Sequence, residues 1–385
     1  MRRERPVFHH ELTEGVAKSV RRDFWMTTKH RHAQRIHRDT DSFTAVDGPL
    51  IQGIGPAGSF PTIINMDPPE LNKRRRVMSH AFTPRAIGKL EDGIRARAAS
   101  MIDRLLTAGG GDWIGDVADV LPMSVIGDII GIPEEDRPRI FDTLDRILAL
   151  NAPESSVSER DQLDLFGGIF SYALELTERK RRDPVDDIWS TLTSAVITDD
   201  TGEQLSIPAN ELEVFFFVLA FAGSDTTKNA LATGLQAFVA NPEQIRRYRA
   251  DESIRAGAVE EVLRWSTPVA FWTRTAKVDL EIDGVAIPKG GRVVSMLRSA
   301  NRDQEVFGDP FTFDIGRTEN PHVAFGGGPH HCLGAMLARA EIRAVLDELL
   351  CRADDIALGP ATVSFPNLTN NMSIYDEMPI SLTPR

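Results

Sequence analysis

The chain has 385 residues, of which 42% are apolar and 26% are charged, and its formal net charge is −12. This composition is ordinary for a folded globular protein. The acidic balance argues against a nucleic-acid-binding protein, which usually carries a basic face. Two cysteines, Cys332 and Cys351, are too few for a disulfide framework and favour a reducing, cytoplasmic compartment.

No apolar stretch is long enough to cross a membrane, because the longest, Val214 to Gly223, is about half of the roughly 20 residues needed. The N-terminal Met-Arg-Arg-Glu-Arg has no apolar signal core behind it. Length alone suggests two or three domains. However, no Pro/Gly/Ser-rich linker, charge run or internal repeat divides the chain. We therefore expect one domain, residues 1–385, large enough to enclose a bulky cofactor.

The predicted elements begin with two short strands, Pro6–His10 and Phe24–Thr28, and a helix between them. A loop rich in glycine and proline follows over Asp47–Asn65, and loops of this length are usually functional. Helical patterns then dominate, and several begin with proline or acidic residues, as helix N-termini prefer. The expected helices are Pro69–Ala81, Ile87–Thr107, Val117–Ile130, Glu135–Leu148, Glu159–Lys180, Ala209–Val239, Pro242–Ala250, Ile254–Trp265 and Ala335–Leu350.

The β structure is a minor component of the predicted fold. Leu280–Ile282 and Val285–Ile287 flank Asp283-Gly284, which is a strong hairpin signal. Further strands are expected near residues 275–298 and 364–383. The sequence therefore predicts a mainly α protein with a minor β region.

The segment Phe325–Gly334, Phe-Gly-Gly-Gly-Pro-His-His-Cys-Leu-Gly, concentrates unusual residue types. Its four glycines permit backbone shapes closed to other residues and let the backbone approach a flat cofactor. Cys332 lies just before a predicted helix, where free N–H groups and the helix dipole favour the thiolate that ligates iron. His330 is placed to reach an acidic group on such a cofactor.

Two other interpretations of this segment remain open when it is considered alone. One is a glycine-rich turn with a buried, inert cysteine. The other is a zinc site made of His330, His331 and Cys332, although adjacent ligands fit tetrahedral zinc poorly.

The helix predicted over Ala209–Val239 is apolar all round at residues 214–222, which indicates that it runs through the interior. Glycine, an acid and hydroxyl residues then break the pattern at residues 222–227. Gly223 leaves space for a small ligand, Asp225 supplies a proton carrier, and Thr226 can bond to the preceding turn and bend the helix. The alternative is a kinked helix with Asp225 paired to a distant cation.

Glu261 and Arg264 are three residues apart on a predicted helix, so their side chains can pair. Most such pairs are exposed and contribute little to stability. Trp265 and the apolar stretch Pro268–Trp272 follow directly, which favours a partly buried pair joined by a further arginine.

These three segments, in this order and at these separations, resemble the cytochrome P450 family. The cysteine segment resembles the Phe-Gly-x-Gly-x-(His/Arg)-x-Cys-x-Gly signature, and residues 222–226 resemble the (Ala/Gly)-Gly-x-(Asp/Glu)-Thr oxygen-activation motif. Glu261 and Arg264 resemble the Glu-x-x-Arg pair, with Arg317 in the place of the third member. These three residues are therefore expected to have a structural role.

The resemblance covers nearly the whole chain, from about Pro6 to Pro384, and includes features of soluble bacterial members. It implies the single-domain, triangular-prism P450 fold, which encloses heme between the long central helix and the cysteine loop. The first helix of the family is expected to be missing or trimmed. Leu71 stands where many bacterial members have a polar heme contact, so the heme is expected to have fewer polar anchors, or to be held by Asn72 and the neighbouring arginines instead.

The resemblance also implies a monooxygenase that uses heme b, dioxygen and two electrons from a separate ferredoxin and its ferredoxin reductase. Cys332 is the expected iron ligand, and Asp225 and Thr226 are the expected catalytic proton relay. The other expected cofactor-binding residues are Arg75, Arg274, His330, Phe325, Gly326, Gly334, Ala222 and Gly223.

The substrate implied by the resemblance is a small hydrophobic compound: a terpenoid, steroid, fatty acid or aromatic. The pocket is expected to be chiefly apolar. Ordinary core packing is the alternative for each of its aromatic residues. The expected pocket residues are Phe216, Phe217, Phe221, Val269, Phe271 and Met372.

An acidic ferredoxin is expected to dock on a basic face on the cysteine side, for which the alternative is an ordinary solvated face. The residues of this face are Lys73, Arg74, Arg76, Arg339 and Arg343. Two rival functions use the same fold. A peroxide-using peroxygenase would not need the Asp225–Thr226 pair, and a non-catalytic heme sensor would bind gas without turnover.

Overall fold

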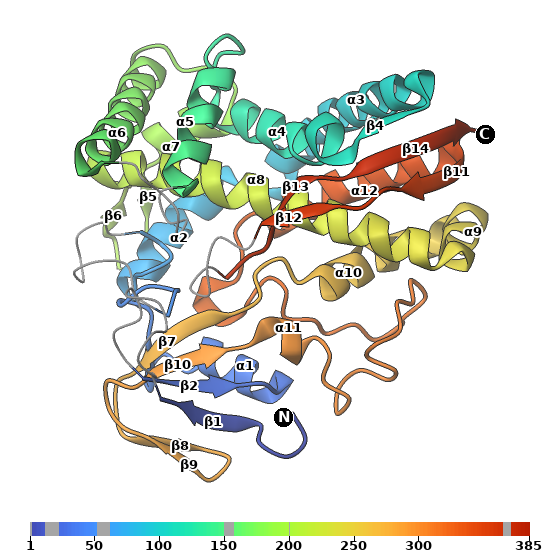
Figure 1. Cartoon of the computed structure of the whole chain (residues 1–385). Helices are drawn as coiled ribbons and strands as arrows, with labels where there is room; N and C mark the ends of the chain where they lie inside the picture. The colour runs from blue at the N-terminus through green and yellow to red at the C-terminus, as the bar shows by residue number, and fades with distance from the viewer. Residues whose placement is uncertain (1, 12–22, 52–61, 150–157, 200, 365–370) are drawn as a thin grey trace.

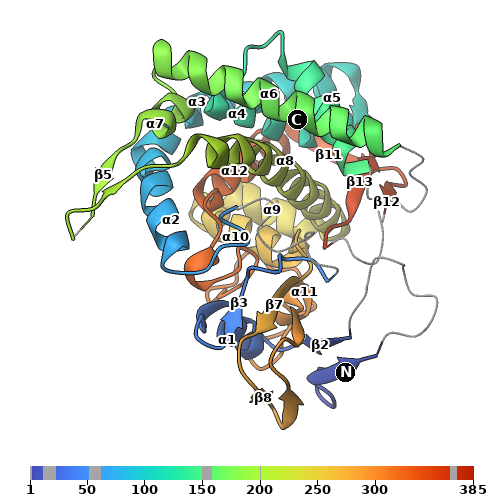
Figure 2. The same cartoon turned by 90° about the vertical axis from the view of Figure 1, so that its left-hand side faces the viewer.

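The computed structural model describes residues 2–11, 23–51, 62–149, 158–199, 201–364 and 371–385. Helices fill most of the molecule, and a sheet that includes the N-terminal strands lies at one end (Figure 1). The long helix α8 (Ala209–Ala240) crosses the interior, with other helices around it in both views (Figure 2). The predicted class, mainly α with a minor β region, is confirmed.

The predicted helices from residue 69 onward are all present, with ends that differ by a few residues, as helix ends commonly do. The structure adds α1, α7 and α11, which the sequence analysis did not predict. Besides α8, the helices of the described residues are α1 (His30–Arg38), α2 (Glu70–Ala81), α3 (Pro84–Ala108), α4 (Val120–Ile130), α5 (Arg137–Ala149), α6 (Glu159–Arg182), α7 (Ile188–Ser194), α9 (Pro242–Ala250), α10 (Arg255–Ser266), α11 (Leu297–Ala300) and α12 (Ala335–Arg352), with a π-helical turn η1 (Ile114–Ala118) and the 3₁₀ turns η2 (Glu252–Ile254) and η3 (Gly328–His330).

Local chemistry fixes the ends of several helices. At the start of α3, the hydroxyl of Thr83 accepts a hydrogen bond from the N–H of Ala86, and Pro84 occupies the first turn. The same helix ends at Gly109, which has a φ of 74°, a left-handed conformation that glycine adopts without strain. These signals explain why the sequence pattern located this helix.

The strands form one five-stranded sheet and several smaller pairings. In the large sheet the order is β1-β2-β10-β7-β3, and only the β2–β10 pair is parallel among its described pairings. Its strands are β1 (Val7–His10), β2 (Phe24–Thr27), β3 (Phe43–Thr44), β7 (Trp272–Ala276) and β10 (Arg292–Ser295). The others are β4 (Gly110–Asp112), β11 (Ala353–Leu358) and β14 (Pro379–Pro384) in one sheet, and the pairs β5 (Ile197–Thr198) with β6 (Gln204–Leu205), β8 (Leu280–Ile282) with β9 (Val285–Ile287), and β12 (Thr362–Ser364) with β13 (Ile374–Glu377).

The predicted hairpin is confirmed, because β8 and β9 pair across Asp283 and Gly284, which both have positive φ. The two predicted N-terminal strands are present as β1 and β2. The helix predicted between them falls at residues 12–22, which lie outside the described residues. Most of the predicted loop at 47–65 lies outside them as well.

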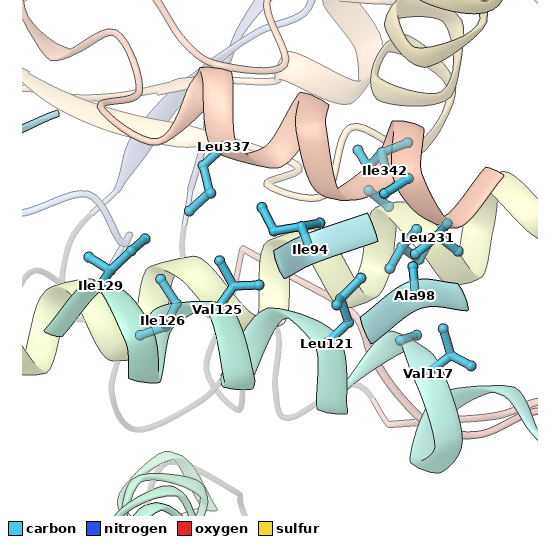
Figure 3. Close-up of a cluster of buried hydrophobic side chains, with 14 of the residues drawn as sticks. Ile94, Ala98, Val117, Leu121, Val125, Ile126, Ile129, Leu231, Leu337 and Ile342 are labelled. Atoms are coloured by element: carbon cyan, nitrogen blue, oxygen red, sulfur yellow. The ribbon is translucent and has the colours of Figure 1, made fainter. Parts of the chain in front are cut away.

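One large apolar cluster joins α3, α4, α8 and α12 (Figure 3). Burying a valine, leucine or isoleucine side chain in this cluster stabilises the fold by about 1.5–3 kcal/mol relative to leaving it exposed. The cluster therefore holds α8 and α12 at a fixed distance from each other. The residues labelled in the figure are Ile94, Ala98, Val117, Leu121, Val125, Ile126, Ile129, Leu231, Leu337 and Ile342.

Helix α1 was missed by the sequence analysis because only two of its nine residues, Ala33 and Ile36, are apolar. Histidines complete its buried face, among them His32 and His37. A search for apolar periodicity does not detect a helix of this kind.

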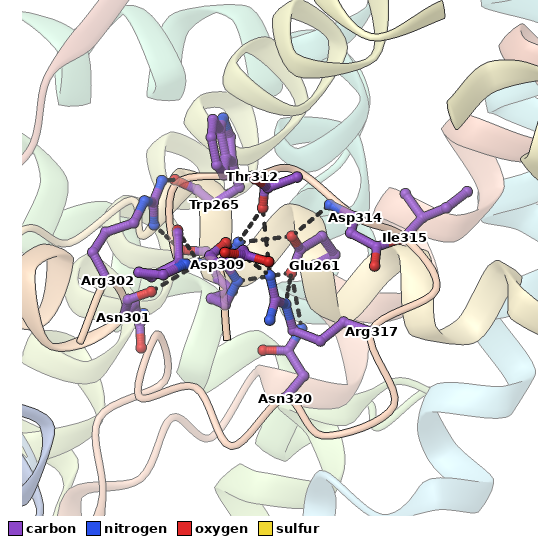
Figure 4. A network of polar contacts seen from close by, with 12 residues as sticks. Glu261, Trp265, Asn301, Arg302, Asp309, Thr312, Asp314, Ile315, Arg317 and Asn320 are labelled. Atoms are coloured by element: carbon purple, nitrogen blue, oxygen red, sulfur yellow. Dashed lines mark hydrogen bonds and ion pairs between the residues drawn. The ribbon is translucent and has the colours of Figure 1, made fainter. Parts of the chain in front are cut away.

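A buried polar network ties α10 to the irregular segment that leads toward Cys332 (Figure 4). Both Glu261 and Arg264 are fully buried, and two hydrogen bonds of 2.7 Å join them. Arg264 also donates to the carbonyl oxygens of Asn301, Pro310 and Thr312. Arg317 Nε lies 3.4 Å from Glu261 Oε2, so this arginine is the third member that the sequence suggested. The network fixes the backbone of residues 301–320 against α10.

We expect Glu261→Ala to lower the free energy of unfolding by roughly 3–5 kcal/mol, because it leaves the Arg264 charge buried without its partner. Chemical denaturation followed by circular dichroism measures this loss. The control is Glu91→Ala, which removes an exposed pair with Arg95 and should cost at most about 0.5 kcal/mol. Equal, small losses in both variants would contradict a structural role for the network.

Candidate active site

A cavity lies between the middle of α8 and the loop that precedes α12. One wall comes from Ala222, Gly223, Thr226 and Thr227 of α8. The opposite wall comes from the cysteine loop, and the remaining lining is largely apolar. Its lining from the loop comprises Phe325, Gly326, His330, Cys332, Leu333 and Gly334.

Close backbone contacts shape the cysteine loop. Gly326 and Gly328 have φ values of 69° and 61°, where side chains are strained. A Cβ on Gly328 would also clash with the carbonyl oxygen of His37, so only glycine fits there. The N–H of Cys332 donates to the carbonyl of Phe325 at 3.0 Å and closes the loop. The backbone therefore holds Cys332 at the cavity wall.

The surroundings of Cys332 do not by themselves favour its ionised form. Cys332 is exposed at the cavity wall, but the surrounding protein still desolvates its thiol and raises the pKa of that thiol. A hydrogen bond from Gly334 and the nearby charges of Arg75 and Arg339 lower this pKa in part. A cation bound at the sulfur would supply the missing stabilisation of the thiolate. The sulfur of Cys332 is thus suited to bind the metal ion of a metal-containing cofactor in the cavity.

Basic side chains gather at one part of the cavity, where the charge of Asp67 acts on one of them, Arg274. Arg75, Arg274 and His330 line it together, although they come from α2, β7 and η3. Arg274 is only 5% exposed, and burial lowers its pKa to about 10. Burial, with the charges of Arg274 and Arg75, lowers the pKa of His330 to about 3. A buried cation such as Arg274 is normally paired, and the neutral His330 can donate a hydrogen bond, so this arrangement fits a ligand that brings its own carboxylates.

The middle of α8 places a hydroxyl at the cavity and an acid beside it. Thr226 lines the cavity, and its Oγ1 donates to the carbonyl of Ala222 at 2.8 Å. The Thr226 hydroxyl therefore forms the hydrogen bond to the preceding turn that the sequence suggested. Gly223 lies against Ile126 of α4, and a Cβ at this position would clash with that side chain.

Asp225 is buried and lies outside the cavity lining among the described residues. Its Oδ1 is 2.8 Å from Lys228 Nζ, which is also 3.0 Å from Asp119 Oδ1. The sequence analysis left open a distant cation as partner, whereas the ion pair is formed within the same helix. The second oxygen, Oδ2, has no hydrogen-bond partner among the described residues. Asp225 is thus tethered by one oxygen, while the other is buried without a hydrogen-bond partner among the described residues.

A second buried acid, Glu341 of α12, was missed by the sequence analysis. It lines the cavity and accepts a hydrogen bond from the hydroxyl of Thr227. Burial raises the pKa of Glu341 to about 8, so the carboxyl is mainly protonated at neutral pH. In the sequence, Glu341 looks like any glutamate on the exposed face of a helix. No pattern along the chain therefore indicated that it is buried at the cavity.

The aromatic residues proposed for the substrate pocket lie in different environments. Val269 lines the cavity. Phe216 packs instead in the core against Tyr172 and Trp189. Phe217, Phe221, Phe271 and Met372 are also outside the lining formed by the described residues. The lining contains Phe215, Phe82 and Trp272, which the sequence analysis did not select.

The residues proposed for a basic face are largely paired with acids. Lys73 contacts Glu203, and Arg74 contacts Glu211. Arg339 and Arg343 contact Glu260 and Asp347, respectively. Arg76 is exposed. These ion pairs reduce the positive electrostatic potential that was expected from the five basic residues.

The zinc interpretation finds no ligand set in the structure. Among the described residues, which include His330, His331 and Cys332, no three His, Cys, Asp or Glu side chains come together to hold a metal ion.

None of the helices in the described part of the chain has the length and apolar character needed to cross a membrane.

Comparison with known proteins identifies the family of this chain. The model of the family described as Cytochrome P450 matches residues 159–352. A steroid C26-monooxygenase of Mycolicibacterium smegmatis is 35% identical over 92% of this chain and 83% of its own length. A methyl-branched lipid omega-hydroxylase of Mycobacterium bovis is 34% identical over 92% of this chain and 84% of its own length.

Solved structures give the same result. A cytochrome P450 of Mycobacterium marinum, solved in complex with pseudoionone, superposes with a TM-score of 0.87 and 34% identity, covering 99% of this chain and 92% of that one. A second, from Novosphingobium aromaticivorans, has a TM-score of 0.86 and 29% identity, covering 100% and 92%. The predicted P450 fold is confirmed.

The chain belongs to the cytochrome P450 family and is a monooxygenase that binds heme b. The cavity fits this cofactor on three counts. A cysteine is available for the iron, buried cations are available for the two carboxylates, and apolar walls suit the flat ring.

Proposed function

We propose that this chain is a heme-thiolate monooxygenase that hydroxylates a hydrophobic lipid, with Cys332 as the iron ligand. The observation that carries the proposal is that Cys332, from the cysteine loop, and Thr226, from the middle of α8, line the same largely apolar cavity. When bound, heme b supplies the iron at which dioxygen is activated and one oxygen atom is transferred to the substrate.

The proposed cofactor-binding residues divide into three groups by chemistry. Cys332 ligates the iron, while Arg75, Arg274 and His330 neutralise the carboxylates. The small residues allow the flat ring to approach the backbone, and Phe325 packs beside the sulfur. These last residues are Ala222, Gly223, Gly326 and Gly334. Because the sheet residue Arg274 and the helical residues line one cavity, we also propose a single domain over residues 1–385.

Cys332→Ser should abolish thiolate ligation and leave Cys351 as the remaining cysteine. We expect the reduced carbon monoxide complex to lose the red-shifted Soret band that is typical of thiolate-ligated heme. Absorption spectroscopy of the purified variant measures this change. Cys351→Ser is the control and should keep the band. A variant at Cys332 with an unchanged spectrum would exclude this residue as the ligand.

We propose that Asp225 and Thr226 move protons into the cavity. The free Oδ2 of Asp225 can accept a proton from water, and Thr226 Oγ1 can pass it on from the cavity wall. The Lys228 pair holds the Asp225 carboxylate in place, so proton transfer requires water or a change of rotamer. A peroxygenase would gain nothing from this pair.

Thr226→Ala should preserve folding and heme content but lower the product formed per reducing equivalent, because more electrons end as hydrogen peroxide. Asp225→Asn should slow turnover by about 10²–10⁴-fold, the usual contribution of general acid–base catalysis. Product, peroxide and consumed NAD(P)H are measured together, with ferredoxin and its reductase as donors.

Ser224→Ala is the matched control for Thr226→Ala. Ser224 bonds back to the Ala220 carbonyl in the same way but does not line the cavity. Equal coupling in both variants, with an unchanged rate in Asp225→Asn, would indicate that the hydroxyls only shape the helix and would favour the peroxide-using or sensing alternatives.

We propose a steroid or a methyl-branched lipid as the substrate. Similarity to the steroid C26-monooxygenase and to the omega-hydroxylase supports this choice within the broader range of hydrophobic compounds. Terpenoids stay in that range, given the pseudoionone complex of a similar structure. The apolar side chains Phe215, Val218 and Leu219 of α8 supply a surface for such molecules.

The ferric enzyme should respond differently to a sterol, a methyl-branched fatty acid and a small aromatic acid when each is titrated and the Soret band is followed. The first two are expected to displace water from the cavity and shift the Soret band toward the high-spin position. Product analysis by mass spectrometry then locates the added oxygen. A shift with the aromatic acid alone would overturn the proposed substrate class.

We propose a ferredoxin as the separate electron donor. The support is the set of cations near α2 and α12, although acidic partners leave that face less positive than its lysines and arginines suggest. Docking would then depend on shape more than on a strong positive field.

A further inference from the structure

His37 occupies an unusual place at the end of α1. It is only 4% exposed, yet it lines the same cavity as Cys332. Its Nε2 has no hydrogen-bond partner among the described residues. A buried polar atom without a partner is costly and therefore uncommon in folded proteins. A ligand bound in the cavity beside His37 would supply the partner that this nitrogen lacks.

The neighbours of His37 define the chemistry of that partner. His37 lies close enough to Arg274 and His330 for both to lower its pKa, after the larger effect of burial. Its ring is therefore mainly neutral at pH 7 and carries one N–H donor. Together with Arg75, these side chains form a group of donors around one part of the cavity. A group with carboxylates would satisfy all of them.

Protein acids do not supply these carboxylates in the described structure. Glu341 is the acid that lines the cavity, and it accepts its hydrogen bond from Thr227 instead. Asp67 interacts electrostatically with Arg274 but accepts hydrogen bonds from Thr44 and Ala45. The donors around His37 are therefore left for the bound cofactor.

The loop geometry brings His37 to this place. The carbonyl oxygen of His37 lies against Gly328, and a Cβ on Gly326 would be 3.7 Å from its Nδ1. The end of α1 thus packs directly on the glycines of the cysteine loop. By contrast, Leu71 is fully buried and Asn72 is exposed outside the cavity lining, so Asn72 does not provide the polar contact expected from the sequence.

We propose that His37 is a further cofactor-binding residue, whose Nε2–H donates a hydrogen bond to a carboxylate of heme b beside Arg274 and His330. This inference rests on the proposed orientation of the heme, with its iron at Cys332. It assigns a helix of the N-terminal region to cofactor retention, in addition to the arginines and histidine expected from the family resemblance.

Two variants of the holoenzyme separate the hydrogen bond from packing. His37→Leu keeps an apolar volume but removes the donor, whereas His37→Gln restores an amide N–H near the position of Nε2. Transfer of ferric heme to excess apomyoglobin measures the rate of cofactor loss. We expect His37→Leu to lose heme about ten- to a hundredfold faster, as for a hydrogen bond to a charged group, and His37→Gln to recover most of the difference.

Resonance Raman spectroscopy provides a second readout that does not depend on activity. The propionate-bending band of the heme should shift in His37→Leu and return toward the native position in His37→Gln. Reconstitution with heme dimethyl ester provides a further test, because this heme has no carboxylates. The native enzyme and His37→Leu should lose the ester at similar rates.

His32→Leu is the matched control on the same helix. His32 is also buried, but its Nε2 bonds to Asp283, and it is absent from the cavity lining. This variant should keep the native rate of heme loss and the native propionate band even if α1 is destabilised.

Three outcomes would overturn the proposal: native heme loss with an unshifted band in His37→Leu; equally fast loss in His37→Gln; or a His37→Leu effect of the same size with the dimethyl ester. The last two would indicate packing alone. The Soret band of the reduced carbon monoxide complex distinguishes this failure from failure of Cys332 ligation, because His37 variants should leave that band unchanged.

Discussion

Charge compensation in the cavity is the constraint on which the rest of this structure depends. Arg274 is almost completely buried, and burial lowers its pKa although the charge of Asp67 acts in the opposite direction. Burial also lowers the pKa of the neighbouring His330. Removing such groups from water is unfavourable unless they are paired. Heme b has two carboxylates, and in our proposal its iron stabilises the Cys332 thiolate, so the cofactor would complete both the electrostatics and the core.

The surrounding scaffold keeps these groups in position by rigid connections rather than by the cavity itself. Glu261 and Arg264 are fully buried and bind the backbone of residues 301–320, which precedes the cysteine loop. On the other side of the loop, α12 packs through Leu337 and Ile342 in the apolar cluster with α4. The loop is thereby anchored at both ends, and its glycines adopt positive φ values that would be strained for other residues.

Helix α8 combines two roles that usually conflict. Its apolar residues stabilise the interior, while Gly223, Asp225 and Thr226 introduce polar and flexible positions at its centre. The ion pair of Asp225 with Lys228, continued to Asp119, compensates for the buried acid within the same region. A buried helix can therefore carry an acid at its centre, because its charge is balanced one turn away.

The sequence by itself determined the class of the fold, most of the helices, the β8–β9 hairpin and the family. Those features depend on local periodicity, capping and the spacing of a few motifs, all of which are visible along the chain. Only the tertiary structure decided which side chains reach the cavity. Phe216 packs in the core although Phe215 lines the cavity, since neighbouring residues of a buried helix face different directions. His37 and Glu341 could not be selected in advance, because their meaning depends on burial and on partners that are distant in sequence.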